Sequence, residues 1–257
     1  MLLEALQDIP GCIPIAPGQV FREPDPERAQ TWIASGMARV PDRRYKNGSS
    51  MVEWPGADVA ILASGPSLSV EQADAVKVWR DAAPQARRVI AINTTFRRAP
   101  WADMLYACDG AWWKIYADEV ARKFPGERWT QDTGAATTYG LRLMKSRRAL
   151  GLSLEPGLVN QGESSGYQAI GIAYQAKARR ALLLGFDNRG CHWHGPHPGG
   201  LNKKNIFASW SKNYVALARE CTAAKFEVVN CTPNSALKSF PFKNWTEEFR
   251  AGHLSDS

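Results

Sequence analysis

The chain has 257 residues, 44% of them hydrophobic, and carries a formal net charge of +7 at neutral pH. This length and composition predict a globular protein with one large core. They exclude a membrane span, because no run of about 18 apolar residues occurs. The first ten residues contain two acids and lack the basic start of a signal peptide. We therefore expect a soluble, cytoplasmic protein.

The five cysteines are odd in number and form no C-x-x-C pair. A disulfide framework or a structural zinc site is therefore not expected. The basic residues occur in small clusters, such as Arg43-Arg44 and Lys203-Lys204. Two interpretations remain open for this charge: a solvated surface, or contacts with phosphate-bearing partners.

The first part of the chain, residues 1–47, predicts a small module. Asp25-Pro26 has the pattern of a helix cap followed by proline at the first helical position, and Gly36 ends that helix after Ser35. Residues 48–57 read as a polar linker. The main domain then spans residues 58–250, and residues 251–257 form a tail.

In the main domain, short apolar runs alternate with longer amphipathic segments. Buried strands interleaved with helices predict an α/β fold, with a doubly wound, mostly parallel, Rossmann-like sheet. The expected strands are 59–63, 89–92, 104–108, 181–184 and 227–230. The expected helices are 70–82, 111–124, 166–176 and 207–224. Between 126 and 162 we expect a strand at 128–130 and a helix through 138–145.

The first strand ends in Ser64-Gly65-Pro66-Ser67, before a capping box formed by Ser69 and Gln72. In an open parallel sheet, ligands bind beyond the carboxyl ends of the strands. Gly65 allows close approach of a ligand, and the Ser67 hydroxyl with the free N–H groups of the helix start can hold an anion. We interpret this turn as a phosphate or nucleotide cradle, with an unliganded tight turn as the alternative.

Further polar residues follow the other expected strands. Each suits a base, a ribose hydroxyl, a phosphate or, for Asp109, a magnesium ion, although helix capping alone can also explain them. They are Asn93, Asp109, Ser164, Ser165, Gly166, Asp187, Asn234 and Ser235.

The loop after Asp187 contains three of the four histidines of the chain, His192, His194 and His197. One of them can serve as a general base, because the ordinary imidazole pKa lies near neutral pH. Metal binding and simple loop ordering are the alternatives. The Gly- and Pro-rich spacing is not helical, so we predict no metal.

With these motifs assembled, the chain resembles the bacterial sialyltransferases that build lipooligosaccharide, which have a Rossmann-like fold and use CMP-sialic acid as donor. Their G-x-G-P-S-L strand end is similar to residues 63–68, and their T-S-G helix start to residues 164–166. Their G-I-D strand end is similar to residues 185–187, their C-P-N-S to residues 232–235, and their asparagine after the second strand to Asn93.

The resemblance implies a nucleotide-sugar-dependent, inverting glycosyltransferase that needs no cofactor. It implies that the turn at Ser67 and the hydroxyl at Ser164 or Ser165 contact the nucleotide, and that a histidine after Asp187 deprotonates the acceptor hydroxyl. Spacing does not select which one. Asn188-Arg189 stands where the family has a tyrosine, and Arg189 can neutralise the leaving phosphate instead.

Two other functions remain open. The G-P-S-L turn also resembles the archaeal-type 6-hydroxymethylpterin diphosphokinases, which implies ATP and magnesium held by Asp109. The whole chain is similar to uncharacterised proteins of tailed phages and prophages, so the acceptor can be a glycan or a modified DNA base. The net charge of +7 and the ten tryptophans are also compatible with a non-catalytic nucleic-acid-binding or virion-associated protein.

Overall fold

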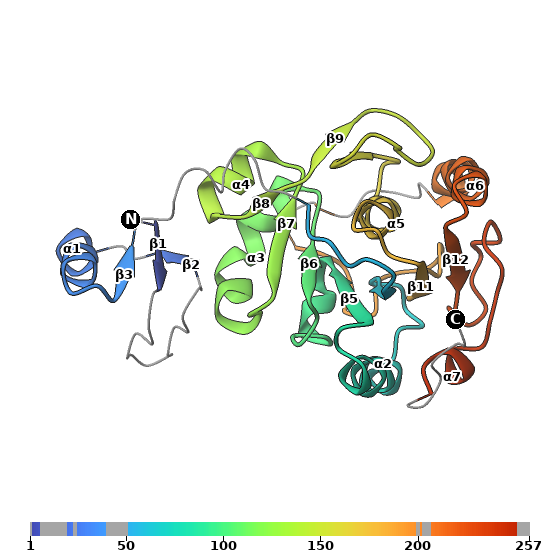
Figure 1. The fold of residues 1–257 in the computed structure, drawn as a ribbon, viewed down its shortest axis with the longest axis horizontal. Helices are drawn as coiled ribbons and strands as arrows, with labels where there is room; N and C mark the ends of the chain where they lie inside the picture. Colours follow the sequence, from blue (N-terminus) through green and yellow to red (C-terminus); the bar gives the residue numbers. More distant parts are fainter. Residues whose placement is uncertain are drawn as a thin grey trace.

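The computed structural model of the chain describes residues 2–5, 20–22, 25–39, 51–198, 201 and 207–250 (Figure 1). Parts of the expected N-terminal module (6–19 and 40–47), the first residues of the expected linker (48–50) and the expected tail (251–257) lie outside these residues. Within them, the fold is α/β with a parallel central sheet, as the sequence predicts. None of the described helices is long and apolar enough to cross a membrane.

The N-terminal residues form a small unit of their own. Strands β1 (Leu2–Ala5), β2 (Val20–Arg22) and β3 (Ala38–Arg39) pair antiparallel in the order β2-β1-β3. Helix α1 (Pro26–Ala34) begins as expected, because the Asp25 carboxylate accepts hydrogen bonds from two backbone N–H groups of its first turn. The unit has its own small apolar cluster, which includes Leu3, Ala29 and Ala38.

The central sheet has seven parallel strands in the order β12-β11-β4-β5-β6-β7-β8. The chain leaves β4 toward β5 on one side, and it later adds β11 on the other side of β4, so the winding direction reverses between these two strands. The bounds are β4 (Asp58–Leu62), β5 (Arg87–Ile92), β6 (Met104–Tyr106), β7 (Glu127–Thr130), β8 (Arg142–Leu143), β11 (Arg180–Leu184) and β12 (Glu227–Asn230).

Helices cover both faces of this sheet, as Figure 1 shows for α5 and α6 against α2 and α7. Alternate residues of each strand enter different cores: Val59 and Ile61 pack with α5 and α6, whereas Ala60 and Leu62 pack with α2 and α3. The bounds are α2 (Val70–Ala82), α3 (Gly110–Lys123), α4 (Thr133–Tyr139), α5 (Ser165–Gln175), α6 (Phe207–Ala223) and α7 (Trp245–Glu248), with a 3₁₀ helix η2 (Asn93–Arg97) after β5.

The prediction of a helix at 138–145 is wrong. Helix α4 starts earlier, because the Asp132 side chain caps it by accepting from the Ala135 N–H, and it ends at Gly140 in the left-handed conformation. The residues that follow form β8 and then β9 (Lys145–Arg147), which pairs in parallel with β10 (Leu158–Asn160) in a separate two-stranded sheet.

Two features connect distant segments to the sheet. Trp54, which precedes β4 in the stretch read as a linker, is buried in the same core as α5. At the start of the sheet, the buried Arg180 side chain bonds Asp58 of β4 at 3.0 Å and Glu248 of α7 at 2.8 Å. This charged network anchors α7 against the amino ends of β4 and β11.

Candidate functional site

The main cavity lies at the carboxyl edge of the sheet, where the winding direction reverses. Its volume of about 380 Å³ falls within the range of about 300–1,000 Å³ that is usual for small-molecule sites. The loops after β4, β5, β6 and β11 and the start of α5 contribute most of its lining. Of the residues singled out from the sequence, the lining includes Ser64, Gly65, Asn93, Asp109, Ser164, Ser165, Gly166, Arg189, His192 and His197.

The turn after β4 is organised around an internal carboxylate. Asp187, which is almost completely buried, accepts hydrogen bonds from the Ser67 hydroxyl at 2.8 Å and the Ser67 backbone N–H at 3.3 Å. A Cβ atom on Gly65 would lie 2.0 Å from an Asp187 oxygen. Gly65 therefore makes room for Asp187, and the donors of Ser67 that the sequence suggested for a phosphate already have an anionic partner.

Burial raises the pKa of Asp187 above its ordinary value, and the hydrogen bonds from Ser67 oppose that shift. Asp187, Pro66 and Ser67 do not border the cavity. Ser64 does border it, but its hydroxyl bonds the Ile92 carbonyl at 3.2 Å and lies 3.0 Å from the Thr95 hydroxyl. The β4 turn thus forms a wall of the cavity, held by bonds to β11 and η2.

A second set of contacts joins the ends of β5 and β6 to α5. The Ser165 hydroxyl donates to the Asn93 side-chain oxygen at 3.3 Å and accepts from the Cys108 N–H at 3.1 Å. Asn93 has a positive φ of 50°, a conformation that asparagine tolerates better than most residues. Asp109 is exposed to the cavity and, although it precedes α3, its side chain makes no capping bond.

The start of α5, with its positive helix end, borders the cavity through Ser164, Ser165 and Gly166. Ser164 caps the helix by accepting from the Tyr167 N–H at 3.2 Å. A Cβ on Gly166 would lie 3.0 Å from Phe186 and 3.2 Å from the Tyr214 hydroxyl, so glycine lets α6 approach. Burial raises the pKa of Tyr214. At neutral pH its hydroxyl is therefore a proton donor, and its distance to the Ser164 oxygen is a long 3.5 Å.

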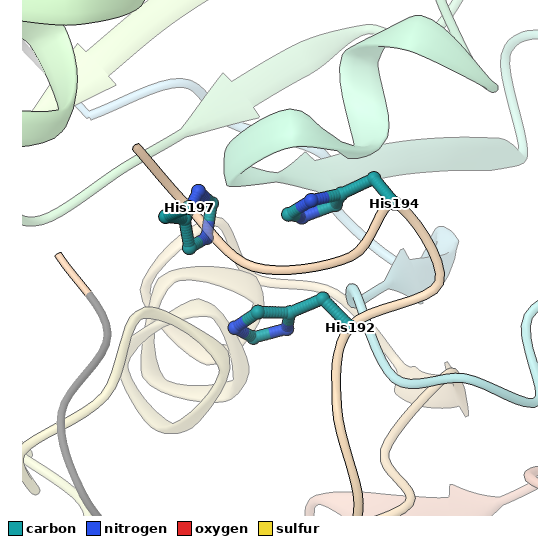
Figure 2. A group of neighbouring side chains, drawn as sticks. All are labelled: His192, His194 and His197. Carbon is teal, nitrogen blue, oxygen red and sulfur yellow. The ribbon is translucent and has the colours of Figure 1, made fainter. Parts of the chain in front are cut away.

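The three histidines of the β11 loop lie together (Figure 2). Their ring centroids are 4.6–5.1 Å apart, and one ligand atom of each lies within 4.8 Å of the others. Burial, followed by the neighbouring histidines, lowers the pKa of His194 and of His197 to about 4. All three rings are therefore expected to be neutral at pH 7, the state in which imidazole can accept a proton or bind a metal.

The loop that carries these rings is fixed to the β4 turn. The backbone N–H of Trp193 donates to the Ser64 carbonyl at 3.0 Å. The Arg98 guanidinium lies 3.8 Å from the centre of the Trp193 ring. A tight turn follows, in which the Gly195 N–H donates to the His192 carbonyl at 3.0 Å. His192 and His197 border the cavity, whereas His194 is not part of its lining.

The remaining expected site residues have different surroundings. Arg189 is exposed at the cavity rim, where its charge can reach an anion. Ser235 is buried and donates to the Phe186 carbonyl at 2.5 Å, so it supports the β11 loop without bordering the cavity. Asn234 is exposed outside the lining.

The sequence indicated the tryptophans only as stacking surfaces for nucleic acid, and it did not place Trp112 of α3 or Trp210 and Tyr214 of α6 in the wall of this cavity. Aromatic residues on amphipathic helices have the same spacing whether they face a core or a ligand, so periodicity does not single them out. The positive φ of 68° at Glu163, just before the α5 cap, has no sequence signal either.

Comparison with known proteins adds no relative: no family model matches the chain, and neither a curated protein nor a solved structure matches it significantly.

Proposed function

We propose that this protein is a glycosyltransferase-like enzyme that takes a nucleotide-activated sugar into the cavity at the carboxyl edge of the sheet. The observation that carries the proposal is convergence: polar ends of three strands, a helix start and the histidine loop border one cavity of ligand size. In a doubly wound sheet, this position at the reversal of strand order is where ligands bind.

The geometry favours the α5 start over the β4 turn as the phosphate-binding end. The Ser67 donors are engaged by Asp187. Ser165 and Gly166 of the first α5 turn border the cavity, and the Tyr214 hydroxyl lies beside the Ser164 cap. A phosphate there would gain from the helix dipole and from a neutral phenol donor.

The other groups on the wall suit the rest of such a donor. Asn93 and the uncapped carboxylate of Asp109 can accept hydrogen bonds from ribose hydroxyls, and the half-buried Trp210 offers a face on which a base can stack. Arg189 at the rim can neutralise charge on the leaving phosphate. The histidine loop would activate the acceptor hydroxyl, either through a free imidazole or through a bound cation.

The first test is a thermal-shift panel of CMP, UDP, GDP, ADP and ATP with their sugar conjugates, each with and without magnesium. A ligand at about 100 times its Kd stabilises by about 2.7 kcal/mol, which is worth roughly 5–11 °C in a domain of this size. We expect one nucleotide and its sugar conjugate to raise the Tm without metal. A response to ATP that requires magnesium and Asp109 would instead favour a diphosphokinase.

The matched variants are Tyr214→Phe and Tyr174→Phe. Tyr214→Phe removes the hydroxyl beside Ser164 and keeps the ring that packs on Phe186 and Phe240. Tyr174 lies at the opposite end of α5 and does not border the cavity. We expect only Tyr214→Phe to weaken binding, by about 10–150-fold, as for loss of one hydrogen bond to a charged group. No response from any nucleotide would contradict the proposal.

A further inference from the structure

The three histidines of the β11 loop have the arrangement of an incomplete metal coordination shell. We propose that His192, His194 and His197 together bind one divalent transition-metal ion of the zinc type, with its open position facing the cavity. This departs from the metal-free expectation drawn from the sequence. The inference stands independently of the proposed nucleotide donor, because it rests on the histidine loop alone.

The first argument is geometric. Zinc binds imidazole nitrogen at about 2.0–2.1 Å, so three such ligands in a tetrahedral shell lie roughly 3.4 Å apart. The ligand atoms of the three rings already lie within 4.8 Å of one another, a difference that side-chain rotation can take up. Among the described residues, this is the one group of three or more metal-ligating side chains that comes so close together.

The second argument concerns hydrogen bonding. The Nε2 atom of His194 is buried and has no hydrogen-bond partner among the described residues. Buried polar side-chain atoms nearly always have a partner, so this one needs an explanation, and a metal ion provides it. His192 also interacts with the Ser64 backbone carbonyl, the kind of outer contact that fixes the tautomer and orientation of a metal-bound histidine.

The surrounding charges suit a cation whose three ligands are neutral. The charge of Asp109 acts on His197 from across the cavity wall. Arg97, whose charge acts on His194, is already paired with Glu119 at 2.5 Å. Three protein ligands with a fourth position open are typical of catalytic rather than structural zinc sites. His192 and His197 border the cavity, so that position would take water, a hydroxyl or a phosphate oxygen.

The test is a calorimetric titration of the chelator-treated full chain with Zn²⁺ alone, without nucleotide. It is repeated with Co²⁺, whose visible spectrum reports coordination geometry. We expect one ion per chain with a four-coordinate cobalt spectrum. The single variants His194→Gln and His197→Gln should each weaken binding by more than the about 10–100-fold typical of losing a merely supporting residue. Thermal denaturation of the metal-free variants checks that they fold.

Two control variants separate this site from other ligands in the chain. His253→Gln alters the fourth histidine, and Cys191→Ser removes the exposed thiol next to His192. Both should bind the ion like the unmodified chain. The proposal is overturned if Zn²⁺ does not bind, if binding survives replacement of all three loop histidines, or if Cys191→Ser abolishes it. Because no nucleotide is present, failure here leaves the nucleotide panel to decide the donor proposal.

Discussion

At the scale of single residues, the tightest constraint is the contact between Gly65 and Asp187. A methyl group on residue 65 would lie 2.0 Å from a carboxylate oxygen and 2.3 Å from the Gly185 carbonyl. We therefore expect Gly65→Ala to lower the free energy of unfolding by about 1–3 kcal/mol, measured by urea denaturation.

Gly171→Ala in α5 is the matched control for that substitution. Its added methyl would meet only Val159, at an ordinary 3.5 Å, and alanine favours the helix. It should leave stability unchanged or raise it. Equal losses for the two variants would show that the Gly65–Asp187 contact is not the constraint we describe.

Asp187 itself predicts a dependence on pH. Its pKa is raised on folding, so its contribution to stability is fully present below the unfolded pKa and is lost as pH rises through the folded pKa. Asp187→Asn removes this dependence. Between about pH 4 and pH 7, the stability of Asp187→Asn relative to the unmodified chain should therefore increase, as measured by urea denaturation at each pH.

The exposed variant Asp74→Asn, on the outer face of α2, serves as the control for that measurement. It should run parallel to the unmodified chain across the same pH range. A constant difference between Asp187→Asn and the unmodified chain would contradict the raised pKa.

At the scale of elements, α7 depends on one buried ion pair. Glu248 is buried beside Arg180 at 2.8 Å, whereas the adjacent Glu247 is exposed. Breaking a buried pair typically costs about 3–5 kcal/mol. Because Asp58 still pairs with Arg180, we expect Glu248→Ala to cost close to the lower end of that range, and Glu247→Ala to have almost no effect. Equal Tm values for the two variants would contradict the anchoring role of the pair.

The elements that the sequence identified are those in which local and tertiary signals agree. Six strands of the sheet and helices such as α2 were found because apolar runs and caps coincide there. The capping box of Ser69 and Gln72 forms as expected. The strand expected at 128–130 is β7, whereas β8, β9 and β10, which are only two or three residues long, were not predicted. Such strands are defined by pairing with distant partners rather than by any local pattern.

At the scale of the whole molecule, strand ends predicted the edge at which a cavity forms, but not which side chains face it. Asn93, Asp109 and Ser164 reach the cavity, while Ser67 turns to Asp187. That pairing spans 120 residues, and no local signal announces it. The sequence did not predict that the three histidine rings lie together, for the same reason. A loop rich in Gly and Pro has no regular period, so the spacing of its residues does not show which of them are close in space.

The order of the strands also determines at what stage of synthesis all the segments that line the cavity are present. β4 is an interior strand of the sheet, yet its neighbour β11 is translated about 120 residues later. A nascent chain that has emerged as far as α5 can pair β4 to β7, but it lacks Asp187, the histidine loop and the α6 wall. The cavity is therefore completed late in synthesis, and an incomplete chain would leave one edge of β4 open to pairing with another molecule.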